Sequence, residues 1–184
     1  MAKENVDHLV KSNWKLDTAH SKLGFSAKHM IISEVEGQFK EFDINVDAGE
    51  DFADTEIEVT IRAASIETGN SDRDNHLKSP DFFDAVNHEE LKFKSRSLER
   101  TNKDEFKLSG DFIIKGISRP IDLDVKYGGK VNDPWGNERV GFQVSGKLNR
   151  FDYGLKWNNL METGGAIVGK TIKINCHVEL IKAE

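Results

Sequence analysis

Strict alternation of apolar and polar side chains runs through Glu56-Ile57-Glu58-Val59-Thr60-Ile61-Arg62-Ala63. Successive side chains of a β-strand point to opposite faces of the sheet, so this stretch predicts a strand with one apolar face and one wet face. Such strands are typical of antiparallel sheets that pack one face on a core. We therefore expect an all-β chain.

The same period of two recurs on both sides of this stretch. It covers residues 22–29, 106–114 and 121–127, and two longer runs over 140–148 and 168–180. Turn-forming Gly, Asn, Asp and Pro residues separate the runs. About eight strands at hairpin spacing favour a barrel or a sandwich.

Alternation fails from Thr68 to Phe83. We predict a short helical interruption around residues 71–83, with Ser71 or Asp72 as the N-cap.

The remaining sequence contains no repeat, low-complexity tract or linker. We assign residues 1–12 to an N-terminal extension and residues 13–184 to a single barrel domain. A length of 184 residues suits one domain with a substantial core.

Composition narrows the function classes. The net charge is -6 and the basic residues are scattered, so a nucleic-acid partner is not expected. Histidines show neither a His-x-His nor a His-Glu-x-x-His pattern, and we expect no metal and no cofactor. The single cysteine, Cys176, shares the inward parity of its strand and is expected to be a buried, inert thiol.

Localisation is inferred from the N-terminal residues. They contain no apolar run of signal-peptide length, which predicts a soluble, cytoplasmic protein. A periplasmic protein trimmed of its signal would have the same sequence.

Aromatic content raises the question of a cavity. Eleven Phe and three Trp against two Tyr would suit a wall that stays dry. Several inward positions are small: Ala27, Ala63, Gly110 and Gly146. An eight-stranded barrel can hold one small ligand, but small residues also relieve crowding in a filled barrel. The pattern alone supports both alternatives equally.

Five segments, in order, carry a family resemblance. They are Asn13–Ser21, Val35–Phe39, Arg73–Asp84, Leu108–Pro120 and Leu148–Leu155. The ordered set closely resembles the YceI-like family of bacterial polyisoprenoid-binding proteins, over nearly the whole chain.

One departure from the family pattern is visible. Family members often carry a proline just before the strand that opens here at Leu91, where this chain has His88-Glu89-Glu90. The difference affects a turn.

The resemblance implies an extended, lipocalin-like antiparallel barrel whose lumen takes a long isoprenoid tail. It implies a non-catalytic lipid-binding protein that transports or stores a polyisoprenoid of the prenyl quinone or prenyl phosphate type. A homodimer is common among proteins of this kind, and transient membrane contact is compatible with such a ligand.

Tail-binding candidates are the inward-facing residues of the predicted strands. They are Leu23, Phe25, Ala27, Phe39, Ile57, Val59, Ile61, Phe93, Phe112, Phe142, Val144, Ile172 and Ile174. For any one of them, ordinary core packing is the alternative.

Head-group candidates are the polar residues expected near the mouth: His29, Arg73, His76 and Lys78. Arg and Lys form charge-assisted bonds with phosphate or quinone oxygens. The alternatives are a hydrogen-bonded core histidine for His29 and a loop-fixing ion pair for Arg73. Leu77, Phe82 and Phe83 would form the apolar side of a lid, or anchor it.

An enzyme is the less favoured reading. Asp17, His20 and Ser21 are the side-chain types of a hydrolytic triad, but the chain has no Gly-x-Ser-x-Gly elbow, so no catalytic residue is assigned. The remaining alternatives are a carrier of another amphiphile such as a fatty acid or amide, an enzyme acting on an isoprenoid head group through His29 or His76, and a filled barrel that acts through its surface.

Overall fold

The computed structural model describes residues 12–49, 52, 54–159, 161–162 and 167–183. In this part of the chain, eleven strands form one antiparallel sheet in the order β1-β4-β5-β7-β8-β9-β10-β11-β2-β3-β6. The strands are β1 (Ser12–Leu16), β2 (Lys22–His29), β3 (Ser33–Phe39), β4 (Phe42–Ala48), β5 (Glu56–Arg62), β6 (Ile66–Glu67), β7 (Glu90–Asn102), β8 (Glu105–Ile114), β9 (Ile117–Asn132), β10 (Glu138–Asn149) and β11 (Val168–Lys182).

The eleven strands make eight rows, because three rows are each divided in two. β1 and β2 follow one another along the same edge of β11. In the next row, β3 pairs with β2 and β4 pairs with β1. In the row after that, β6 pairs with β3 and β5 pairs with β4. The predicted all-β barrel of about eight strands is therefore confirmed.

The barrel is closed by the pairing of β1 with β11. Trp14 lies opposite Lys182, Lys15 opposite Ile181, and Leu16 opposite Leu180. This pairing completes the ring that runs from β1 through β4 and β5 to β10 and β11, so β1 and β11 have partners on both sides.

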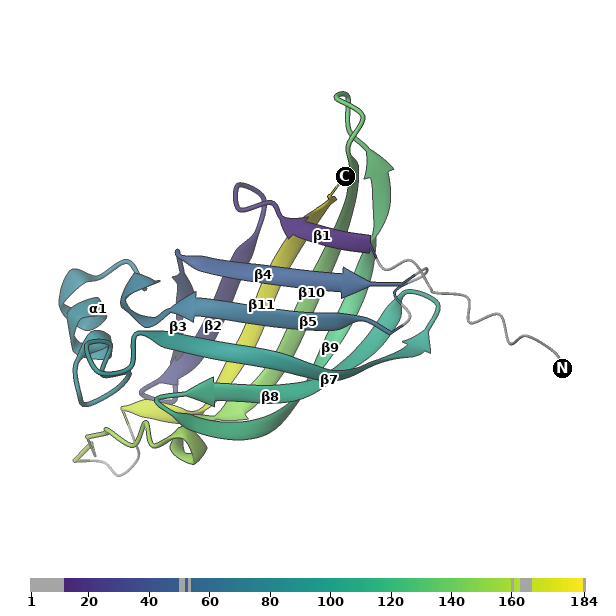
Figure 1. Cartoon of the computed structure of the whole chain (residues 1–184). Coiled ribbons are helices and arrows are strands. Elements are labelled where there is room, and N and C mark those ends of the chain that lie inside the picture. Colours follow the sequence, from purple (N-terminus) through teal and green to yellow (C-terminus); the bar gives the residue numbers. More distant parts are fainter. Residues whose placement is uncertain (1–11, 50–51, 53, 160, 163–166, 184) are drawn as a thin grey trace, which may run out of the picture.

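Helix α1 (Ser71–Lys78) lies outside the end of the barrel where η3 (Arg150–Tyr153) and residues 154–159 also lie (Figure 1). The predicted N-cap was wrong: the Asn70 side chain accepts from the Arg73 amide at 2.9 Å. The helix also ends at Lys78 rather than near residue 83. Pro80 disfavours helical backbone at Ser79, whose ψ is 169°.

The strands bury alternate side chains inside the barrel. Ile44, Val46 and Ala48 of β4 are buried, while the residues between them are exposed. Of the predicted extension over residues 1–12, residues 1–11 lie outside the described part and Ser12 begins β1. No helix in the described part of the chain has the length and apolar character that a membrane-spanning helix requires.

Gly110 and Gly146, two of the four small inward residues, do not leave open space, which favours the alternative that small residues relieve crowding. A Cβ added at Gly110 would lie 2.5 Å from the Phe93 ring, and one at Gly146 would lie 2.5 Å from a methyl of Leu123. Large side chains therefore pack against both glycines. Small residues at these two positions relieve crowding, and the cavity described below has another origin.

Candidate binding cavity

The barrel encloses a cavity of about 270 Å³. Its wall combines aliphatic side chains with phenylalanine rings from all eight rows. The polar side chains in the wall are Thr55, Cys176 and Arg150. The Thr55 hydroxyl donates to the Phe52 carbonyl at 2.6 Å. Among the described residues that line the cavity, Arg150 is the one with a charged side chain.

Inward-facing apolar residues in the middle of the barrel are only half-buried. Ile57, Val59, Val144 and Ile174 belong to this group, although all four point into the barrel. They pack against two clusters of fully buried residues, one of which contains Phe93, Phe106 and Leu123. Side chains that face inward and still keep accessible surface indicate an interior that the protein's own side chains do not fill.

Aromatic clusters border the cavity at two places. We call the first the Phe52 cluster: Phe52 packs on Trp14, Tyr127 and Phe142, with its ring centroid 5.3 Å from that of Phe142. The second, the Trp157 cluster, contains His76, Phe82 and Trp157, whose centroids lie 4.6 to 5.4 Å apart. The Trp157 cluster joins α1 and the turn that follows it to the segment after η3.

All thirteen predicted tail-binding residues line the cavity: Leu23, Phe25, Ala27, Phe39, Ile57, Val59, Ile61, Phe93, Phe112, Phe142, Val144, Ile172 and Ile174. Their contact with a ligand stays a prediction. The three apolar residues expected at the lid, Leu77, Phe82 and Phe83, line it as well.

The four predicted head-group residues lie outside the wall of the cavity. Arg73 donates to the Thr68 hydroxyl at 2.7 Å and to the Thr68 carbonyl at 2.8 Å. His76 bonds to Asp81 at 2.8 Å and packs on Phe82. Two further candidates, His29 and Lys78, are half-buried at the ends of β2 and α1. Among the four, His76 comes closest, through its ring contact with a lining residue.

Arg150 was missed by the sequence analysis as a site residue. It belongs to a quoted family segment, but nothing in the local pattern shows that its side chain turns inward. Its exposure is 3%, and Phe151 and Phe82 lie beside its guanidinium, with ring centroids 4.8 and 5.9 Å away. Burial lowers its pKa.

Cys176 is buried in the wall, as predicted. Burial raises the pKa of its thiol to about 11, and the thiol donates to the Gly24 carbonyl at 3.8 Å. The thiol is therefore protonated at neutral pH, and a protonated thiol is a poor nucleophile.

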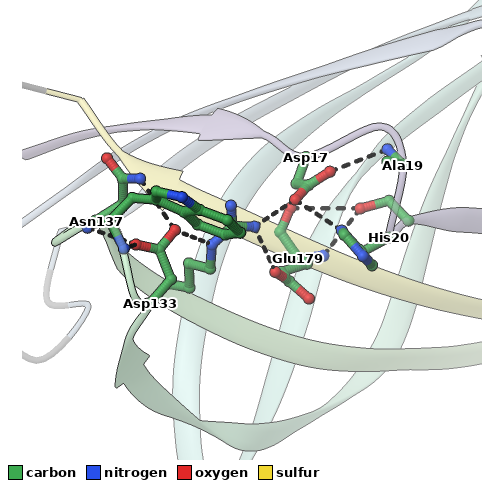
Figure 2. Close-up of polar contacts among 9 residues, drawn as sticks. Asp17, Ala19, His20, Asp133, Asn137 and Glu179 are labelled. Carbon is green, nitrogen blue, oxygen red and sulfur yellow. Dashed lines mark hydrogen bonds and ion pairs between the residues drawn. The ribbon is translucent and has the colours of Figure 1, made fainter.

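Asp17, His20 and Ser21 lie outside the cavity and do not form a triad. His20 Nδ1 lies 2.9 Å from Asp17, whereas the Ser21 hydroxyl accepts from the Glu179 amide at 2.9 Å. Figure 2 shows Asp17 with Ala19 and His20 on one side of this polar group and Asp133 with Asn137 on the other. The three residues serve as structural hydrogen-bonding groups between β1 and β2.

Arg139 joins these carboxylates. It bonds to Asp17, to Asp133 at 2.7 Å and to Glu179 at 2.8 Å. Asp17, His20 and Glu179 also present ligand atoms within 4.8 Å of one another, a spacing that suits a metal ion. In this structure, however, the positive charge between Asp17 and Glu179 is the guanidinium.

An eight-row antiparallel barrel around an apolar cavity defines a protein built to bind an apolar ligand. The family model of the YceI-like domain matches residues 14–180 of the sequence, and the chain belongs to this family.

Three known proteins show how close the relationship is. A UPF0312 protein of Staphylococcus aureus is 38% identical over 175 residues, which cover 94% of this chain and 99% of that protein. The crystal structure of the Campylobacter jejuni YCEI protein is 31% identical, has a TM-score of 0.71, and covers 85% of this chain and 90% of that one. A polyisoprenoid binding domain from Saccharophagus degradans shares the fold, with a TM-score of 0.67 at 14% identity over 92% of this chain and 98% of that one.

The Arg139 network predicts a pH-dependent stability. Desolvation raises the pKa of Asp17 and of Asp133, but hydrogen bonds outweigh it and hold both below 3.8: from His20 and Arg139 for Asp17, and from Asn137 and Arg139 for Asp133. A carboxyl with a depressed pKa stabilises the fold above its unfolded pKa, and this stabilisation is lost as the pH falls through the folded value. Arg139→Gln should therefore lower the melting temperature most near pH 7, and the deficit should shrink below about pH 4.

Thermal unfolding of the wild type and of Arg139→Gln, from below pH 4 to pH 7, measures the difference in melting temperature. Arg96→Gln is the matched control, because Arg96 pairs with Asp111 on the exposed outer face and makes the same change in charge. A deficit for Arg139→Gln that is equal at all pH values, or no larger than that of the control, would contradict the prediction.

Proposed function

We propose that this protein binds and carries a long-chain lipid, with the apolar tail inside the barrel and without chemical conversion. The observation that carries the proposal is the cavity, whose wall has apolar side chains in all eight rows and includes inward-facing residues, such as Val144 and Ile174, that are only half-buried. Water gains little by filling such a space, whereas a hydrocarbon chain can fill it without losing hydrogen bonds.

A polyisoprenoid is the proposed ligand class. The family to which the chain belongs and the fold shared with a polyisoprenoid binding domain support this choice. The wall offers branched aliphatic and aromatic side chains, which suit a branched, unsaturated chain as they suit other apolar ligands.

The energetics favour a carrier rather than a permanent store. A chain of about 40 carbons at about 0.8 kcal/mol per methylene would exceed the ceiling for non-covalent binding if it came from water. A lipid taken from a bilayer moves between two apolar environments, so most of this gain cancels. Exchange with a membrane then stays reversible.

Filling the cavity tests the proposal. Val144→Trp should lower the affinity for a prenyl alcohol by about tenfold or more, because the indole takes up space that the tail needs. Ser145→Trp is the matched control: the neighbouring residue on β10 is exposed and points outward. Displacement of a fluorescent lipid measures both affinities, and circular dichroism checks both folds.

The two variants separate a lumenal site from a surface site. Equal affinities in folded Val144→Trp and wild type would place the lipid outside the lumen and contradict the proposal. The control should bind as the wild type does.

A second observation supports loading at a membrane. The turn between β2 and β3 exposes Ile31 by 64% and Ile32 by 88%, and the Met30 amide ties the turn to Ile167 just before β11. Ile31 has a φ of 70°, a backbone conformation that β-branched residues avoid. Exposed, contiguous apolar residues of this kind suit insertion into the interfacial region of a bilayer.

Ile32→Ser should slow lipid transfer from vesicles severalfold while leaving the equilibrium affinity unchanged, because the residue contacts the membrane and not the bound tail. Val131→Ser is the matched control, because Val131 is also an exposed β-branched residue, at 64%, but lies near the C-terminal end of β9 and not in the turn between β2 and β3. Stopped-flow transfer of a fluorescent lipid measures the rates. Equal rates for both variants and the wild type would exclude this turn from loading.

A further inference from the structure

Arg150 is a charged residue inside an otherwise apolar cavity. It follows β10 directly and begins η3, and its exposure is 3%. It lines the cavity together with Phe82, Leu155 and Val168. These residues mark the end of the barrel beside the Trp157 cluster.

Main-chain carbonyl groups hold the guanidinium in place. Nε donates to Gly169 at 2.9 Å, and Nη1 donates to Leu155 at 2.6 Å and to Trp157 at 2.8 Å. Nη2 donates to Val168 at 3.2 Å. Arginine has five N–H donors, so one donor on Nη2 is left without an acceptor among the described residues.

The hydrogen bonds of the Arg150 guanidinium all go to main-chain carbonyls, and no carboxylate of the described residues lies within ion-pair distance of it. Arg139, on the outside of the same barrel, bonds to three carboxylates. A buried charge is costly unless it is paired, and arginine does not escape the cost by losing its proton at neutral pH. The carbonyl oxygens offset part of the cost but supply no opposite charge.

We infer that Arg150 receives the anionic oxygen of the ligand's head group, and that the carried lipid is therefore a single-chain amphiphile with an acidic head, a carboxylate or a phosphate. This inference rests on the proposed function and narrows its ligand class. An anionic oxygen would accept from the free Nη2 donor and neutralise the buried charge in one contact.

The placement also sets the orientation of the ligand. With the head at Arg150, the tail extends along Val144 and Ile174 toward the Phe52 cluster, through the part of the cavity where the inward side chains are half-buried. The head then lies just inside the Trp157 cluster and close to the exposed turn at Ile31 and Ile32, since Val168 follows the Ile167 carbonyl to which that turn is tied.

Three ligands with the same tail test the inference: geranylgeraniol, geranylgeranoic acid and geranylgeranyl phosphate. The wild type should bind the acid or the phosphate about tenfold or more tighter than the alcohol, and the stronger of the two identifies the head group. Arg150→Gln should reduce this ratio to about one while changing the affinity for the alcohol by less than about twofold. Arg150→Lys should keep a preference for the anion, and Arg96→Gln on the outer face should leave the ratio unchanged.

The outcomes separate the two levels of the proposal. If the alcohol binds but the wild type shows no preference for either anion, the role of Arg150 is overturned and lipid carriage stands. A ratio retained in Arg150→Gln also overturns it. If no ligand of the three binds, both proposals fail. Should Arg150→Gln not fold, the wild-type ratio and Arg150→Lys still decide the question.

Discussion

Three residue pairs between β1 and β11 close the ring of paired strands that runs from β1 through β4 and β5 to β10 and β11, and the arrangement of the interior depends on this closure. Once the sheet is closed, the alternation of side chains along each strand assigns every residue either to the lumen or to solvent. The backbone groups of β1 and β11 are then satisfied by neighbouring strands on both sides. The lumen therefore needs no polar side chain to complete the sheet, and its wall can be apolar in every row.

An apolar lumen of this size differs from an ordinary core. Phe93 and Leu123 pack tightly over Gly110 and Gly146, so parts of the interior are filled to the density of a normal protein. The cavity lies beside inward-facing residues that other side chains do not cover fully, such as Val144 and Ile174, which are only half-buried. A charged residue in such a place is expensive, and Arg150 is tolerated because carbonyl groups at the end of the barrel surround it.

Much of the fold could be predicted from the sequence, because period-two alternation reports directly on which residues share a face. The stretch Glu56–Ala63 became β5 with its predicted parity, followed by a turn of 3₁₀-helix at η2 (Ala63–Ser65). The division of three rows into two strands each could not be predicted, since it depends on pairing across the barrel. The cap of α1 was predicted at Ser71 or Asp72, one or two residues too late, because Asn70, Ser71 and Asp72 are all competent N-caps and only the backbone decides among them.

The apolar residues of the cavity wall could be predicted from the sequence, whereas the charged residue at the end of the cavity could not. Thirteen inward residues could be named from parity alone, and all of them line the cavity. Arg150 could not be named, because its burial depends on carbonyl groups of Leu155, Val168 and Gly169 that tertiary structure brings together. Phe52 could not be named either, because it lies outside the predicted strands. It lines the cavity and packs on Trp14 and Phe142.

Native mass spectrometry of the gently purified protein, followed by organic extraction, shows whether the lumen holds a lipid. We expect a stoichiometric bound mass that extracts as a prenyl lipid and that is lost in Val144→Trp. A protein that carries no bound mass and takes up no added prenyl lipid would contradict it.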